Sequence, residues 1–544
     1  MIHNSALSFD DLTLEEQIGQ LFMVGFRGTT PSPEILDMIS RYHVGGVILF
    51  SRNVQDTQQV LELTGSLQEA ARAAGHRFPL LIAIDQENGA VQRLGRGATQ
   101  FPGNMALGAI GSEQITRDIA FATGRELRAL GLNMNLAPVV DVNNNPANPV
   151  IGVRSFGEDP QQVARLAAAV VRGYQEAGVI ATLKHFPGHG DTSTDSHLSL
   201  PTLPFTLERL EQVELVPFRA GIEIGADCVM SAHIAFPAIS GRADIPATLS
   251  PAIIQGLLRA QLGFGGVVIS DCLEMQAIAD TAGIARGSVL ALQAGIDLVL
   301  ISHLYQRQQS GLEATLQAVQ SGELPYTTVR QAVERVLQLK SRRLSWESLP
   351  SGAVPSWVGG AEHRRLSEHA YDLSTTLVRN DDGLVPLRLQ PHERILVIAS
   401  SKDMRSQAED RQYSSVPLVE SLRRYHENVE SLTIPADLKE EDIPQLLAAS
   451  GQFDLVLMVT VNANRDPQQA TLMRALLQSG QRVVGLAVGT PYDLLAFPTL
   501  RTYLVTCEPT GPAQGAAAKV LFGQVESKGR LPVSLLLPSC CQKS

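Results

Sequence analysis

Residues 184–197 hold the densest group of side chains that can transfer protons or bind a polar ligand. The segment contains three histidines and two aspartates, and two glycines, Gly188 and Gly190, interrupt it. The apolar run 179–183 precedes it. This pattern predicts a strand that ends in a polar loop, which is how a rigid scaffold presents acid–base chemistry. We expect the two glycines to let the loop move when a ligand binds.

Asp195 and His197 are candidates for a catalytic pair within this loop. Only Ser196 separates them, so the carboxylate can accept the proton of one ring nitrogen. That bond would fix the tautomer and leave the other nitrogen for proton transfer. The alternative is a local turn around Asp195 with an unconnected histidine beside it.

Asp271 follows the apolar run 266–270 directly. A carboxylate at the end of a buried strand costs free energy unless it is paired or used. Two roles stay open, a reactive carboxylate or the N-cap of the next helix.

Further charged residues follow other apolar runs. Asp85 ends the run 80–85, Arg93 lies eight residues on, Arg154 follows the run 133–142, Lys184 ends the run 179–184 and His185 follows it. Carboxylates and forked donors around one opening suit a small ligand rich in hydroxyl groups. The alternative is a ring of structural ion pairs.

Apolar runs alternate with amphipathic stretches throughout the first 343 residues. We predict eight strands there, over 20–26, 44–50, 80–85, 133–142, 179–184, 228–233, 266–271 and 298–302. We predict helices over 33–42, 57–74, 113–130, 160–176, 207–224, 251–262 and 284–294. Strict alternation implies parallel strands with crossover helices, and eight units indicate a (β/α)₈ barrel, whose active sites lie at the carboxyl ends of the strands. A doubly wound open sheet is the competing fold.

The predicted organisation is a barrel over residues 1–343, a linker over 344–375 and a second α/β domain over 376–544. Strands of the second domain are expected at 395–399, 455–461, 483–488, 503–507 and 533–537. No glycine-rich phosphate-binding fingerprint follows its first strand, so we do not predict a nucleotide domain.

Composition limits the partners. With 44% hydrophobic and 18% charged residues the chain is globular, and its net charge of −11 disfavours nucleic acid. No apolar run is long enough to span a bilayer, and no signal peptide is visible, so we expect no membrane partner. Five scattered cysteines suit reduced thiols and a cytoplasmic location.

Several motifs together carry a resemblance to a known family. They are Asp85-Gln86-Glu87 with Arg93, Ile151-Gly152 with Arg154-Ser155-Phe156, the run 184–197, Ser231-Ala232-His233, and Ile269-Ser270-Asp271 with Met275. The second region adds 377–380, 384–387, 489–493 and 529–533. Because it carries these motifs in the same order as that family, the chain resembles family 3 glycoside hydrolases, specifically the bacterial β-N-acetylglucosaminidases of cell-wall turnover. The resemblance implies a (β/α)₈ barrel followed by a C-terminal α/β sandwich domain.

The resemblance also implies roles for single residues. Asp271 matches the nucleophile that forms a covalent glycosyl-enzyme, His197 the general acid/base, and Asp195 its partner. The positions implied to bind the sugar are Asp85, Arg93, Arg154, Lys184, His185, His233 and Met275. The implied activity is a retaining exo-β-N-acetylglucosaminidase that releases terminal N-acetylglucosamine from cell-wall-derived glycosides, without a metal or organic cofactor.

Other functions stay open. A phosphorylase could use the same Asp271 and His197, because a histidine acid/base need not repel phosphate as a carboxylate would. A family 3 β-glucosidase and a non-catalytic sugar-binding protein are further alternatives. A metal-dependent barrel hydrolase would need ligands from His185, His189, Asp191, His197 and Asp271. The aglycone, the oligomeric state and the role of the second domain are not predicted.

Overall fold

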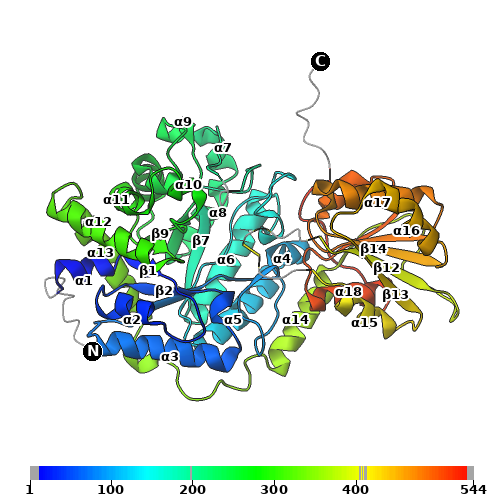
Figure 1. The fold of residues 1–544 in the computed structure, drawn as a ribbon, viewed down its shortest axis with the longest axis horizontal. Coiled ribbons are helices and arrows are strands. Elements are labelled where there is room, and N and C mark those ends of the chain that lie inside the picture. Colours follow the sequence, from blue (N-terminus) through cyan, green and yellow to red (C-terminus); the bar gives the residue numbers. More distant parts are fainter. Residues whose placement is uncertain (1–11, 196–198, 403–405, 407, 410–412, 536–544) are drawn as a thin grey trace.

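The protein consists of two α/β domains that lie side by side (Figure 1). A computed structural model describes residues 12–195, 199–402, 406, 408–409 and 413–535. The helix α14 (Ala361–Ser374) packs against helices of both domains. In the described residues no helix is long and apolar enough to cross a membrane.

The first domain is built on eight parallel strands in the order β10-β1-β2-β3-β6-β7-β8-β9. Backbone bonds between β9 and the residue before β10 close the ring, with Ser270 N donating to Leu298 O at 3.0 Å. The predicted barrel is therefore confirmed, and the open sheet is wrong. The strands are β1 (Phe22–Val24), β2 (Gly46–Leu49), β3 (Leu81–Ile84), β6 (Met134–Asn135), β7 (Ile180–Phe186), β8 (Cys228–Ser231), β9 (Val267–Ser270) and β10 (Val299–Ile301).

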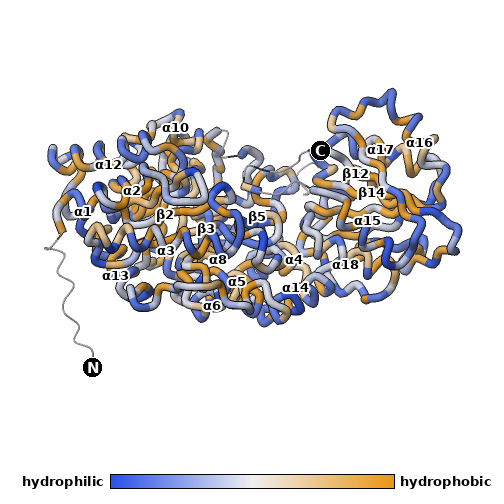
Figure 2. The backbone as a smooth tube through the Cα atoms, turned by 60° about the horizontal axis from the view of Figure 1, so that its bottom comes forward, coloured by the Kyte–Doolittle hydropathy of each residue, from blue (hydrophilic) through white to orange (hydrophobic). Residues whose placement is uncertain are grey.

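Helices cover the outside of the barrel. Residues of all eight strands are buried, as their apolar sequences require, and Figure 2 shows hydrophobic segments around β2. The helices are α1 (Leu14–Gly19), α2 (Pro33–Ser40), α3 (Thr57–Ala73), α4 (Asn104–Ile110), α5 (Glu113–Ala129), α6 (Pro160–Glu176), α7 (Leu207–Gln212), α8 (Leu215–Glu223), α9 (Pro237–Ser240), one over Ala252–Gln261, α10 (Gln276–Ala279), α11 (Ile284–Ala294), α12 (Tyr305–Gln320) and α13 (Tyr326–Arg343).

Local sequence sets the helix ends. At the start of α6 the Asp159 side chain accepts from Gln161 N, and Pro160 occupies the first turn, where a missing N–H costs nothing. The single helix predicted over 207–224 is instead two, α7 and α8. Pro217 explains the break, because it cannot donate to the carbonyl of Val213 and its ring clashes there.

The second domain is a six-stranded mixed sheet in the order β11-β16-β15-β14-β12-β13, in which only β11 runs antiparallel. Apolar cores lie on both of its faces, under α16 and α17 on one side and α15 and α18 on the other. The predicted sandwich is confirmed. Its elements are β11 (Thr376–Asn380), β12 (Ile395–Ser400), α15 (Val416–Arg423), β13 (Val429–Ile434), α16 (Ile443–Ser450), β14 (Leu455–Thr460), α17 (Pro467–Gln478), β15 (Val483–Ala487), β16 (Thr502–Val505) and α18 (Gly511–Leu521).

The described part of the strand predicted over 533–537, residues 533–535, is not a strand. The preceding backbone bonds to the first domain instead, with Arg530 N donating to Ala109 O and Glu158 N to Pro532 O. In addition, Met105 of α4 belongs to the apolar core of the second domain. The two domains therefore share a packed interface.

Candidate active site

One cavity of about 380 Å³ opens at the carboxyl end of the barrel strands. This volume suits a small, largely enclosed ligand. Among the residues that line it are seven of those predicted from sequence: Asp85, Arg93, Arg154, Lys184, His185, Asp271 and Met275.

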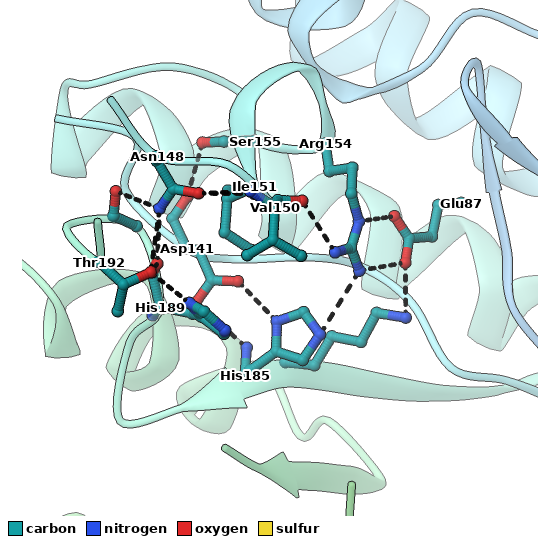
Figure 3. A network of polar contacts seen from close by, with 12 residues as sticks. Glu87, Asp141, Asn148, Val150, Ile151, Arg154, Ser155, His185, His189 and Thr192 are labelled. Carbon is teal, nitrogen blue, oxygen red and sulfur yellow. Dashed lines mark hydrogen bonds and ion pairs between the residues drawn. The ribbon is translucent and has the colours of Figure 1, made fainter. Parts of the chain in front are cut away.

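A cluster of buried charges forms one wall of the cavity. The Lys184 ammonium lies 2.7 Å from Asp85 Oδ1 and 2.6 Å from Glu87 Oε1. Arg154 donates two bonds to Glu87, at 2.8 and 2.9 Å, as Figure 3 shows. Glu87 comes from the short hairpin of β4 (Gln86–Asn88) and β5 (Val91–Gln92), which follows β3. Each side chain therefore holds its neighbour in one orientation.

The cations decide the ionisation of Glu87. Burial is the largest single influence and would raise the pKa of Glu87, but the charges of Arg154 and Lys184 outweigh it and hold that pKa far below its usual range. The same pairing raises the pKa of Arg154, against the effect of its own burial. Both side chains thus stay charged. Sequence reasoning placed Glu87 in a motif but gave it no role.

His185 is oriented from behind by Asp141. Its Nδ1 lies 2.7 Å from Asp141 Oδ2, and its Nε2 lies 3.5 Å from a nitrogen of Arg154. Asp141 Oδ1 also accepts from the backbone N of His189 at 2.7 Å. Burial would raise the pKa of Asp141, but His185 and His189 lower it overall. A carboxylate on Nδ1 leaves Nε2 of His185 for a ligand.

The loop after β7 is tied down through Asn148. The Asn148 amide donates to the carbonyls of His189 and Gly190, both at 2.9 Å, and its oxygen accepts from Ile151 N at 2.8 Å (Figure 3). Burial lowers the pKa of His189 to about 4, so this imidazole is neutral near pH 7. Its Nδ1 lies 2.8 Å from Thr192 Oγ1.

The two glycines of this loop pack closely in this conformation, and their predicted role in loop movement stays a prediction. A Cβ on Gly190 would lie 1.7 Å from the carbonyl oxygen of Val142, and one on Gly188 would lie 2.8 Å from the side chain of Glu214. The absence of a Cβ at both positions therefore allows the close packing seen here.

The predicted catalytic pair is only partly described. Asp195 is 8% exposed and does not line the cavity. It lies close enough to Arg465 of the second domain to interact with its charge. His197 lies outside the described residues.

Asp271 directly follows β9 and faces the cavity. Its Oδ1 accepts from the backbone N of Cys272 at 2.7 Å. The next helix, α10, has Met275 in its capping position, so Asp271 is not the N-cap that was its alternative role.

His233 is not among the described residues that line the cavity. It is fully buried, with Nδ1 2.8 Å from Thr248 Oγ1 and Nε2 3.0 Å from the carbonyl oxygen of Cys272. We therefore assign it to holding the turn that follows Asp271, in place of the sugar contact that we predicted.

The second domain reaches the cavity at Ala408. The carbonyl of Ala408 accepts from Arg93 Nη1 at 2.9 Å, and another nitrogen of Arg93 lies 3.8 Å from Asp85 Oδ2. No sequence signal marks Ala408, because its backbone makes the contact.

The metal-ligand set considered from sequence does not converge. In the part of the chain that the structure describes, the only group of three ligand side chains close enough to share an ion is Cys272, Glu274 and His303. The described members of the predicted set have other partners; Asp191, for example, lies 3.4 Å from Arg209.

The structure combines a closed barrel, which carries charged residues at the carboxyl ends of its strands, with an α/β sandwich. Comparison with known protein families identifies the class of protein that has this architecture. Residues 13–339 match the glycosyl hydrolase family 3 N terminal domain, and residues 375–537 match the family 3 C-terminal domain. The chain belongs to glycosyl hydrolase family 3.

Individual members of the family that resemble this chain indicate which type of glycosyl hydrolase it is similar to. The chain is 33% identical to β-hexosaminidase A of Pseudoalteromonas piscicida, over 96% of this chain and 97% of that protein. It is 42% identical, with a TM-score of 0.90, to the structure of a family 3 β-N-acetylglucosaminidase from Paenibacillus sp. str. FPU-7, over 96% and 99% of the two chains. A fungal multi-domain family 3 β-N-acetylglucosaminidase is also 42% identical, with a TM-score of 0.91, and this chain spans 61% of its length.

Proposed function

We propose that this protein is a retaining exo-β-N-acetylglucosaminidase. The observation that carries the proposal is the gathering of Asp271 and the Asp85–Lys184–Arg154 charge cluster around one cavity of about 380 Å³. A cavity of this volume supports removal of one terminal sugar and not cleavage within a chain. The β-N-acetylglucosaminidase with 42% identity over nearly both whole chains supports the choice of sugar.

In the proposed reaction Asp271 attacks the anomeric carbon and forms a covalent glycosyl-enzyme. His197, with Asp195 as its partner, protonates the departing oxygen and then removes a proton from water, which releases the sugar. This is the two-step course of retaining glycosidases, with an imidazole in place of the usual second carboxylic acid.

The charge cluster is suited to bind the hydroxyl groups of the sugar that do not take part in the reaction. Asp85 offers acceptor oxygens, while Lys184 and Arg154 offer donors, so hydroxyl groups of either orientation find a partner. Because these side chains already hold one another, little conformational entropy is lost when the sugar binds. Met275 adds an apolar side chain to the cavity lining.

We also propose a cytoplasmic role on cell-wall fragments. The three described cysteines, Cys228, Cys272 and Cys507, are free thiols, which supports a reducing compartment. The cell-wall substrate is inferred from the family resemblance in the motifs.

The test is hydrolysis of aryl N-acetyl-β-glucosaminide and aryl β-glucoside, with and without phosphate. We expect preference for the first substrate and no effect of phosphate. Asp271→Asn should lower kcat by on the order of 10⁴-fold or more, as loss of a nucleophile does. His197→Ala should impair alkyl glycosides far more than aryl glycosides, whose leaving groups need little protonation.

Three outcomes would count against the proposal. Faster turnover with phosphate, yielding sugar 1-phosphate, would identify a phosphorylase. Preference for the glucoside would identify a β-glucosidase. An Asp271→Asn variant that folds and retains full activity would exclude Asp271 as the nucleophile.

A further inference from the structure

A second group of reactive side chains lies on the cavity wall next to Asp271. Cys272 and Glu274 belong to the turn after β9, and His303 follows β10, the neighbouring strand of the barrel. One possible ligand atom from each of the three lies within 4.8 Å of the other two. Cys272 and His303 also line the cavity.

Hydrogen bonds hold together the two turns that carry these three side chains. Glu274 accepts from the backbone N of His303 at 2.5 Å and of Leu304 at 3.1 Å, which ties the two turns to each other. The Cys272 sulfur lies 2.9 Å from Ser302 Oγ and 3.9 Å from Glu274 Oε2. The cluster is therefore present before any ligand arrives.

Thiolate, carboxylate and imidazole together are the ligand types of zinc and similar cations. Bonds to Zn²⁺ are about 2.0–2.3 Å long, so ligand atoms around a tetrahedral ion lie roughly 3.3–3.7 Å apart. The present separations are at most 4.8 Å, so closing onto an ion needs a movement of no more than about 1 Å, which the exposed ring of His303 can make. The cavity leaves room for a fourth ligand such as water.

We propose that Cys272, Glu274 and His303 form an inhibitory site for a soft divalent cation, Zn²⁺ or Cd²⁺. On binding, the metal–sulfur bond replaces the S–H bond and the proton passes to solvent, so affinity rises with pH. The thiolate and the Glu274 carboxylate together balance the two charges of the ion. Two cations oppose binding: Arg307, whose nitrogen lies 3.7 Å from Glu274 but whose side chain is 44% exposed, and the less exposed Arg52, whose charge interacts with those of Cys272 and Glu274.

The position of the bound ion would inhibit glycoside hydrolysis. The sulfur belongs to the residue next to Asp271, so a bound ion with its water occupies the cavity beside the proposed nucleophile and attracts its carboxylate. This consequence rests on the proposed function, whereas metal binding itself does not.

The test titrates the full-length protein with Zn²⁺ by calorimetry and with Co²⁺ by absorption, beside aryl-glycosidase assays. We expect one ion per chain, a sulfur-to-cobalt band in the near ultraviolet, and inhibition that a chelator reverses. Cys272→Ala and His303→Asn should each weaken Zn²⁺ binding at least ~10–100-fold, since even partners of metal ligands have effects of that size. Mg²⁺, which takes oxygen ligands, should neither bind there nor inhibit.

Matched controls are Cys228→Ala, a buried cysteine of β8, and His369→Asn, an exposed histidine of α14. Both should bind Zn²⁺ as the natural protein does. Absence of calorimetric binding, or equal affinity in Cys272→Ala, would overturn the site. If Zn²⁺ binds and Co²⁺ gives the sulfur band but no glycoside is hydrolysed, the site stands and the proposed function fails.

Discussion

Two buried glutamates, one on the β4–β5 hairpin and one beside its turn, behave in opposite ways. Glu87, on β4, is paired with Arg154 and Lys184. Glu508, from the second domain, accepts from the backbone N of Gly103 at 2.7 Å and from Thr510 Oγ1 at 3.0 Å. Cations hold the pKa of Glu87 well below its usual range despite burial, whereas burial raises the pKa of Glu508 to about 7.

The difference shows that burial alone does not set the charge of an acid. Inside the cavity wall, the cations keep Glu87 ionised, which fixes the orientation of Arg154 and Lys184. At the domain interface the Glu508 carboxyl is held by neutral donors, so near neutral pH it carries a proton for much of the time. In the cavity wall Glu87 acts as a negative charge, whereas at the domain interface Glu508 acts as a hydrogen-bonding group.

The largest effect is expected from Glu87→Gln. It removes the charge that compensates two buried cations, which should cost about 3–5 kcal/mol of unfolding free energy. Because Arg154 and Lys184 also lose their orientation, kcat/KM should fall on the order of 10²-fold. Denaturant titration and aryl-glycosidase kinetics measure the two effects.

Glu126→Gln is the matched control, because Glu126 is a buried glutamate of the same domain that pairs with His363, away from the cavity. It should lose stability with little change in kcat/KM. Unchanged kinetics in Glu87→Gln would contradict the role given to Glu87.

Glu508→Gln should change how stability depends on pH. The folded-state pKa of about 7 lies above the ordinary value of 4.5, so the native protein binds more protons than the unfolded chain between these values. Its unfolding free energy therefore falls as pH rises through that window, by up to about 3 kcal/mol for this group. Gln keeps the neutral form, so the variant should match the natural protein near pH 4.5 and exceed it at pH 8.

Chemical denaturation at both pH values measures this difference, with Glu427→Gln as an exposed control. A Glu508→Gln variant less stable than the natural protein at pH 8 would mean that the ionised carboxylate is the stabilising form.

Gly89→Ala tests the contact between the hairpin and Glu508. Gly89 has φ of +60°, and a Cβ there would lie 2.6 Å from Glu508 Oε2 and 2.8 Å from Gly103 Cα. Overpacking and backbone strain should together cost about 2–4 kcal/mol. Gly75→Ala, at φ of +82° with nothing within 4 Å, should show the strain alone. Equal losses in the two variants would mean that the contact does not restrain the hairpin.

The smallest effect is expected from Arg93→Lys. Lysine keeps the positive charge but cannot reach both the Ala408 carbonyl and Asp85 with a planar fork. We expect KM to rise about 3–10-fold with kcat nearly unchanged, as for loss of uniform binding. A fall in kcat without a change in KM would place Arg93 at the reacting centre.

The sequence predicted the structure best where a local pattern, such as a run of apolar residues, determines the secondary structure. Apolar runs located all eight barrel strands, and the barrel rule then places Asp85, Lys184 and Asp271 around one opening. The edge strands β11 and β13 were missed because an edge strand need not be apolar; three residues of β13, Glu430, Ser431 and Thr433, are exposed.

Long-range packing could not be predicted. Gly190 is typical of a flexible loop in sequence, but only the fold brings the Val142 carbonyl against it. The link between Arg93 and Ala408 joins residues 315 positions apart through a backbone carbonyl, which leaves no mark on side-chain type.

The most direct test of the account is to trap the glycosyl-enzyme. A fluorinated N-acetylglucosaminyl donor that slows the second step should add one sugar mass to the intact protein, and peptide mapping should place it on Asp271. A sugar attached to a different residue, or full turnover of this donor by Asp271→Asn, would contradict the proposed mechanism.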